Sequence, residues 1–263
     1  MQHGIHNGTA LRAGGALTGV SQFAVEVVAR LVSRDPAEEV APREDVLERF
    51  IAAIATSDPM AFEELKPELK RARISAAMLA DVYIPEAARR LGQGWMDDTA
   101  TFAEVTMGVA RMQAILREIG TAWIADCRGQ SVGPTMLVVL PVGEQHTLGG
   151  MVLAGRLRRL GISVSMQIAP SVADLGAYVA ARAFDGAMIS IAGDDKLETC
   201  AKLIKIIKEA SKGSVKVAVG GALFETGHDV SALTGADVVT NNIEHALSVM
   251  GIVTTKPLEL EFA

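Results

Sequence analysis

The feature that most constrains the fold is a change of hydrophobic period near residue 134. Beyond it, apolar runs of five to seven residues alternate with helical patterns, five times in succession. The strand-like runs are 135–141, 162–168, 186–192, 214–219 and 236–240. The helical patterns that follow them are 147–160, 171–183, 195–211, 223–233 and 242–250. Five consecutive strand–helix units predict a parallel sheet that is covered by helices on both faces.

This Rossmann-like unit spans 133–252 and is followed by a C-terminal tail, 253–263. Five strands at this spacing favour the flavodoxin-like strand order 2-1-3-4-5. In such sheets, ligands bind at the carboxyl ends of the strands, near the point where the strand order reverses. The loops that follow the first, third and fourth strands are therefore the first places to look for chemistry.

The segment 43–127 has a different pattern. Apolar and charged residues alternate there at three- and four-residue spacing, and no strand-like run intervenes. The third helix is expected to stop at Gly92–Gly94, and a long fourth helix to cover 101–127. This pattern predicts a four-helix bundle that caps the sheet unit, with 128–134 as a turn-rich linker.

The N-terminal segment 1–42 reads as a tail with one helix. Residues 1–20 lack periodicity, whereas 21–34 place apolar residues on one helical face behind Ser21, a plausible N-cap. A stretch with two prolines, 35–42, follows as a linker. We expect the helix 21–34 to face a partner.

Composition narrows the function classes. The net charge is −6, and the densest basic groups, 70–73 and 156–159, lie on helical patterns, so a nucleic-acid surface is not expected. Cys127 and Cys200 are too few for a disulfide framework. The N-terminus lacks a signal-peptide pattern, and no apolar run could span a bilayer. We therefore expect a cytoplasmic protein without membrane contact.

Polar and small residues follow three of the expected strands. His146 lies in the loop after the first strand, Ser190 ends the apolar part of the third, and Gly220 and Gly221 follow the fourth. Because the carboxyl ends of parallel strands meet at one edge, these residues should converge there. Consecutive glycines leave room for a bulky group to approach the backbone.

A dinucleotide is excluded by two details. The first strand–helix turn contains no GxGxxG, and the second strand, 162–168, does not end in the acidic residue that would hold a ribose. A nicotinamide-type cofactor is therefore not expected at this edge.

Three short motifs resemble those of cobalamin-binding domains. EQHTLG at 144–149 resembles their DxHxxG motif, with Glu144 in place of Asp. SIA at 190–192 resembles their SxL motif, and GG stands at 220–221; 40 and 27 residues separate the three motifs. The segment 92–113 resembles the part of the family's helical cap that lies across the upper face of the corrin.

The resemblance implies that cobalamin binds base-off and His-on. Its nucleotide tail would leave the cobalt for a cleft lined by small residues, and His146 would become the metal ligand. A ligating imidazole needs an acceptor for its second nitrogen, and Glu144 is placed to supply one. Gly149 and Gly150 would let the following helix start close to the tail, and Ser190 could donate to the benzimidazole.

The candidate cofactor-binding residues lie in the three motifs, at the end of the fifth strand and on the cap. They are Glu144, Gln145, His146, Thr147, Leu148, Gly149, Ser190, Gly220, Gly221, Thr240, Trp95 and Met107. Trp95 and Met107 can equally belong to the core of the bundle. No catalytic residue is expected.

The longer stretch GEQHTLG at 143–149 resembles one branch of this family, the AerR/PpaA-type antirepressors of photosynthesis genes in purple bacteria. That resemblance implies a cofactor-responsive or light-responsive transcriptional regulator, not an enzyme, that binds a repressor protein instead of DNA. DNA-binding cobalamin photoreceptors carry a Glu-His pair on the cap, and the aligned positions here are Val105 and Thr106.

Two alternatives stay open. Corrinoid methyl carriers, which serve a separate methyltransferase, have this size and two-part plan. Related sensor domains hold heme in place of cobalamin. The upper ligand of the cobalt, the response to light and the oligomeric state stay open too.

Overall fold

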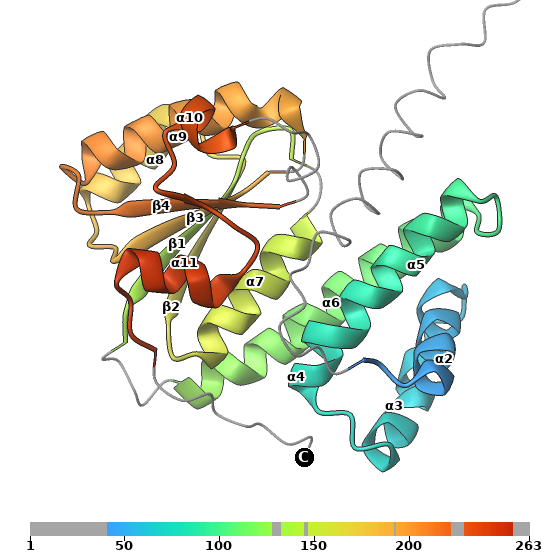
Figure 1. Ribbon diagram of the computed structural model, residues 1–263. Coiled ribbons are helices and arrows are strands. Elements are labelled where there is room, and N and C mark those ends of the chain that lie inside the picture. The colour runs from blue at the N-terminus through green and yellow to red at the C-terminus, as the bar shows by residue number, and fades with distance from the viewer. Residues whose placement is uncertain (1–40, 128–132, 145–146, 192, 222–228, 255–263) are drawn as a thin grey trace, which may run out of the picture.

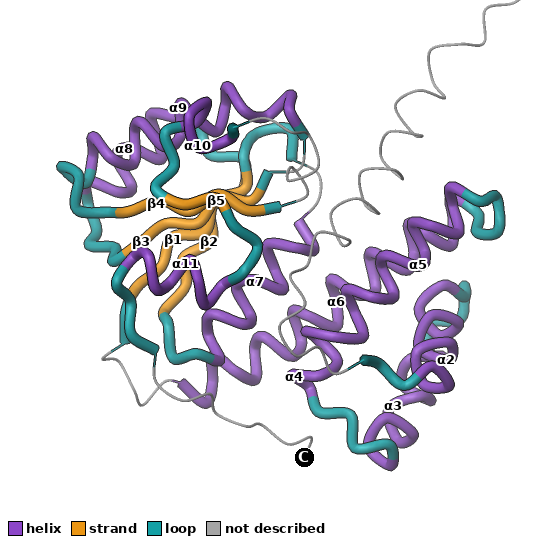
Figure 2. Tube along the Cα trace, in the orientation of Figure 1, coloured by secondary structure: helices purple, strands orange, loops and turns teal. Residues whose placement is uncertain are grey.

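The sheet confirms the predicted order. The computed structural model describes residues 41–127, 133–144, 147–191, 193–221 and 229–254 (Figures 1 and 2). Five parallel strands lie in the order β2-β1-β3-β4-β5. Their bounds are β1 Thr135–Leu140, β2 Ser163–Ile168, β3 Gly186–Ser190, β4 Lys216–Gly220 and β5 Val238–Val239. The helix expected at 21–34 and the tail from 255 onward lie outside the described residues.

Helices cover both faces of the sheet, as Figure 1 shows. One face packs against α8, α9 and α10, and the other packs against α7 and α11. Alternate residues of β1 face the two layers, with Leu137 on the first face and Met136 on the second. The helices are α7 Thr147–Arg159, α8 Val172–Ala180, η2 Asp194–Lys196, α9 Leu197–Ala210, α10 Val230–Thr234 and α11 Ile243–Met250.

The last strand is shorter than the expected 236–240. The backbone of Asp237 donates to Val217, and its carboxylate accepts the Val217 N–H at 2.7 Å. A side-chain oxygen thus takes the place of a backbone carbonyl at this level, which limits the regular ladder to Val238–Val239.

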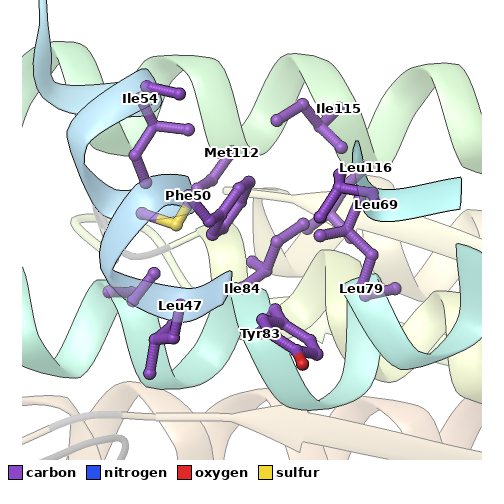
Figure 3. Packing of buried hydrophobic residues seen from close by; sticks show 14 of the residues in the cluster. Leu47, Phe50, Ile54, Leu69, Leu79, Tyr83, Ile84, Met112, Ile115 and Leu116 are labelled. Carbon is purple, nitrogen blue, oxygen red and sulfur yellow. The ribbon is translucent and has the colours of Figure 1, made fainter. Parts of the chain in front are cut away.

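The bundle forms from four helical stretches, as predicted. They are α2 Glu44–Ala55, α3 Ala61–Arg71, the continuous stretch α4 Ala76–Met78, η1 Leu79–Tyr83 and α5 Ile84–Met96, and finally α6 Phe102–Cys127. Phe50, Tyr83 and Met112 are fully buried at the centre (Figure 3). Arg111 of α6 donates to the free carbonyls at the end of α2, including that of Ile54 at 3.0 Å, and so fastens these helices together.

The expectation that Gly92–Gly94 would stop a helix is wrong, because α5 continues to Met96. The chain folds back after that point, and the N–H groups of Thr99 and Ala100 both donate to the Gly94 carbonyl, at 2.8 and 2.9 Å. A Cβ on Gly94 would lie 3.2 Å from the Ala100 side chain. The glycine serves the close return of the chain, not the end of the helix.

The helix α7 belongs to both layers. Its residues Ala154 and Leu157 are buried, and Leu157 packs under the sheet, whereas Leu148, Met151 and Val152 pack against the core of the bundle. The bundle and the sheet are therefore held together through one shared helix. Among the described helices, none has the length and apolar character that would be needed to cross a membrane.

Candidate functional site

The carboxyl edge of the sheet brings several predicted site residues together. Ser190 pairs with Gly220 across β3 and β4, and β1, whose loop contains Glu144, lies next to β3. Thr240 follows β5 at the same edge. Gln145 and His146 lie outside the described residues, so their places at this edge stay predictions.

The loop after β1 begins with a tight turn. The Glu144 N–H donates to the Pro141 carbonyl at 3.1 Å, and Gly143 has a φ of +78°, the left-handed conformation that favours glycine. The turn carries Glu144 into the protein, where it is only 8% exposed. The Lys196 ammonium lies 3.3 Å from the place of a Cβ on Gly143. The sequence reasoning missed this cation, which precedes α9 and carries no motif.

The first turn of α7 contains three predicted site residues with different surroundings. Thr147 accepts a hydrogen bond from Gln113 of α6 at 2.9 Å. Leu148 is buried among the bundle residues and belongs to that core. Gly149 is exposed, and a Cβ there would meet no described atom within 4 Å. Gly150 differs, because a Cβ there would lie 3.0 Å from the Leu140 side chain.

The two glycines after β4 are required by the chain itself. A Cβ on Gly221, which has a φ of +119°, would lie 1.9 Å from the Ile191 carbonyl oxygen. A Cβ on Gly220 would lie 2.9 Å from the Thr240 carbonyl oxygen. Asn241 clamps this point, since it accepts from the Gly221 N–H at 2.7 Å and donates to the Gly221 carbonyl at 3.0 Å. Sequence reasoning missed Asn241; its place after the fifth strand was the available signal.

Two hydroxyl groups at this edge differ in their hydrogen bonds. The Thr240 hydroxyl accepts from the Asn242 N–H at 3.1 Å. The Ser190 hydroxyl is half-buried and makes no hydrogen bond to any residue within the described parts of the chain. Because the Thr240 hydroxyl is the acceptor in its bond, both hydroxyls can still donate to a ligand, and Ser190 is the one with no hydrogen bond to a described residue.

The cap residues lie on α5 and α6. Trp95 is half-buried, packs against the bundle core and meets Phe102 edge-to-face with ring centroids 5.6 Å apart. Met107 is half-buried. Val105 is buried in the bundle core, whereas Thr106 is exposed. The alternative of a bundle-core role thus applies to Trp95.

Figure 1 shows α6 next to α7. The hydrogen bond from Gln113 to Thr147 marks the point where α7 begins beside α6. Thr106 and Ala110 precede Gln113 by seven and three residues, which places them on the same face of the helix, and both are exposed. This half of α6 therefore extends beyond α7 on the side of the β1–α7 loop.

Known proteins resemble the chain in sequence and in fold. No protein-family model matches it. It is 40% identical over 186 residues to the "Uncharacterized 20.5 kDa protein in bchF-crtJ intergenic region" of Rhodobacter capsulatus, and these residues are 71% of this chain and 97% of that protein.

One solved structure shares the architecture, and a second gives a weaker match. The monomethylamine corrinoid protein of Methanosarcina barkeri gives a TM-score of 0.60 at 14% identity, and the match covers 79% of this chain and 98% of that one. A cobalamin-binding protein of Desulfitobacterium hafniense DCB-2 gives a TM-score of 0.41 at 14% identity, with 78% and 97% covered. The first match shows that the Rossmann-like sheet with its preceding helices is a known fold. The sequence match over almost the whole length of the Rhodobacter capsulatus bchF-crtJ intergenic-region protein shows that this chain belongs to its family.

Proposed function

We propose that this protein binds cobalamin base-off at the carboxyl edge of its sheet, with His146 as the lower ligand of the cobalt. We further propose that it is a cytoplasmic transcriptional regulator, acting as an antirepressor on a repressor protein. The observation that carries the cofactor part is the surroundings of Gly149.

Gly149 lies on the first turn of α7, yet the described chain does not need a glycine there. Glycine within a helix costs up to about 1 kcal/mol relative to alanine. At Gly150 the nearby Leu140 side chain explains the glycine, but no described atom lies within 4 Å of a Cβ on Gly149. Gly120 on α6 shares this lack of neighbours, so the feature that distinguishes Gly149 is its exposed place on the first turn of α7, directly after the loop that contains His146. A glycine at this place suits a contact with a ligand outside the chain.

The surrounding residues fit the nucleotide tail of a corrinoid. Gly149 would border the tail on one side, and the half-buried Ser190 hydroxyl could donate to its base. Glu144, being buried, would orient the second nitrogen of the His146 imidazole. Gly220 and Gly221 have a narrower role than the sequence suggested, because the Ile191 and Thr240 carbonyls already fill the space next to them.

When bound, a corrinoid supplies a cobalt centre whose upper ligand can be exchanged or, for an alkyl group, removed by light. The protein's part would be to hold the cobalt from below and to shape the space above it. The exposed face of α6 with Thr106 and Ala110 offers no imidazole for the upper position. This face of α6 would therefore leave the upper position to another group.

Two findings support the regulatory branch. The stretch 143–149 resembles antirepressors of photosynthesis genes, and the curated relative is named for the bchF-crtJ intergenic region of Rhodobacter capsulatus. The net charge of −6 favours a protein partner over nucleic acid.

The rival function is that of a corrinoid methyl carrier. It is favoured by the match to the Methanosarcina barkeri corrinoid protein over 98% of that chain. A carrier would cycle its cobalt with a methyl donor and a partner methyltransferase. A regulator would bind its repressor with an affinity that depends on the cofactor and its upper ligand, without turnover. Methyl transfer to the cobalt and binding to the repressor, both measured on one preparation, separate the two functions.

Absorption spectra test the cofactor directly. The protein is reconstituted separately with hydroxocobalamin, adenosylcobalamin and heme, alongside the His146→Ala variant. We expect a base-off, His-on corrin spectrum for the wild type and a different lower-ligand spectrum for His146→Ala. An unchanged corrin spectrum in His146→Ala would disprove ligation, and binding of heme alone would replace cobalamin by heme in the proposal.

Gly149→Ala tests the proposed place of the tail. The methyl group should raise the stability of the empty protein by up to about 1 kcal/mol and weaken corrinoid binding about tenfold or more, because it enters the space of the tail. Gly120→Ala on α6 is the matched control, since a Cβ there also meets no described atom within 4 Å. Equal affinities for the two variants, measured by corrinoid titration, would remove Gly149 from the site.

A further inference from the structure

The helix that precedes α6 contains a local change of hydrogen bonding. Between α4 and α5, the turn η1 Leu79–Tyr83 is a π-helix, in which the Ile84 N–H donates to the Leu79 carbonyl five residues back. Pro85 follows at the start of α5 and has no N–H to donate to the preceding turn. The missing donor explains why the wider turn forms here, and such turns displace the side chains they carry.

The π turn places Asp81 next to the C-terminal end of α7, a helix of the sheet unit. Its carboxylate is hydrogen-bonded and ion-paired to the guanidinium of Arg159, the last residue of α7. The Arg159 side chain is 8% exposed and that of Asp81 is 23% exposed. Among the ion pairs between described residues, this is the most buried, and it joins the bundle to the sheet unit. Buried ion pairs are costly to break, because one charge is then left without its partner's stabilisation.

The helix α7 is thus attached to the bundle along its whole length. Its first residue, Thr147, is hydrogen-bonded to Gln113 of α6. Leu148 and Met151, which follow in the first turns of α7, pack against the bundle core. At the C-terminal end of α7, Arg159 is ion-paired to Asp81 of the bundle. The loop that contains His146 leads directly into this helix.

We propose that Asp81 and Arg159 are positioning residues, a clasp that fixes the bundle on α7 and so sets how α6 stands over the β1–α7 loop. Releasing the clasp loosens α4, η1 and α5 from the end of α7, and α6, which shares their core, can then shift relative to the β1–α7 loop. The part of this proposal that concerns the cobalt rests on the proposed function; the clasp itself does not. Its effect at the cofactor would be on access to the upper face, because α6 extends past α7 on that side.

Hydrogen exchange on the protein without cofactor tests the clasp alone. The variants are Asp81→Asn, Arg159→Gln and the charge-conserving Arg159→Lys. We expect amides of α4, η1 and α5 to exchange about tenfold faster or more in the first two, and close to the wild-type rate in Arg159→Lys. The control is Arg156→Gln on the same helix, which breaks the exposed pair with Glu244 at 3.6 Å. Equal exchange in Asp81→Asn, Arg159→Gln and Arg156→Gln would overturn the clasp.

A second measurement tests its effect on the site. With hydroxocobalamin bound, the rate at which azide replaces the upper ligand is followed by absorption. We expect about tenfold faster replacement in Asp81→Asn than in the wild type or Arg156→Gln, with the lower-ligand spectrum unchanged. Faster amide exchange without faster ligand replacement would overturn the positioning role. Failure of the wild type to bind any corrinoid would refute the proposed function, while the hydrogen-exchange result would still decide the clasp.

Discussion

At the scale of single residues, the glycines at the carboxyl edge have two different explanations. The sequence suggested that a ligand required the pair after β4. In the structure, Gly221 is required by the chain, because the Ile191 carbonyl oxygen lies 1.9 Å from the place of its Cβ and Asn241 bonds to both sides of its backbone. Gly149, in the first turn of α7, has no such neighbour among the described atoms.

Gly221→Ala should lower the free energy of unfolding by about 1–3 kcal/mol more than Gly213→Ala. Both positions have a positive φ, +119° and +79°, and so share the strain of an L residue there. A Cβ on Gly213 meets no described atom within 4 Å, so only Gly221→Ala adds a collision. Urea denaturation measures both variants, and equal losses would show that the loop after β3 yields to the methyl group.

At the scale of elements, ion pairs fix α5 to α2. Glu86 in the first turn of α5 accepts from Arg89 and Arg90, and Arg90 also pairs with Glu44 of α2. The hydrogen bond from Arg89, opposed by partial burial and aided by Arg90, holds the pKa of the Glu86 carboxyl below its usual value of 4.5. A carboxyl whose pKa is lowered by folding stabilises the protein above its unfolded pKa, and this contribution is lost as the pH falls through the folded value.

We therefore expect the free energy of unfolding to fall below about pH 4.5 more steeply in the wild type than in Glu86→Gln. The difference should stay below about 1 kcal/mol, because the pair is partly exposed and screened by solvent. Urea denaturation between pH 7 and pH 3 measures it, and high salt should reduce the difference. Parallel pH profiles for the two proteins would mean that the Glu86 carboxyl has the same pKa in the folded and the unfolded chain.

At the scale of the whole molecule, α7 packs against both the bundle and the sheet, so we expect the two layers to unfold together. Leu148, a predicted cofactor residue, is buried in the bundle core although it belongs to a helix of the sheet unit. On the opposite face of the sheet, burial raises the pKa of the Cys200 thiol to about 12, so this thiol should react only after unfolding. Substitution of Leu148 therefore perturbs the bundle, and labelling of the Cys200 thiol reports on the sheet layer.

Leu148→Ala should lower the free energy of unfolding by about 2–4 kcal/mol, whereas Leu233→Ala, at a side chain 55% exposed on α10, should change it by less than about 0.5 kcal/mol. Far-UV circular dichroism and Cys200 labelling in a Cys127→Ser background should give coincident urea transitions in each variant. Labelling of Cys200 at a urea concentration where the helices persist would show that the layers unfold independently.

The sequence by itself determined the five-strand parallel sheet, its order, the four-helix bundle and the edge where the motifs meet. These follow from hydrophobic period and from the handedness of strand–helix units, which are local properties of the chain. It could not predict that α5 passes Gly92–Gly94, that Asn241 clamps Gly221, or that Asp81 pairs with Arg159. Each of these depends on two segments that meet only after folding, when burial and backbone approach decide which glycine is required and which charge finds a partner.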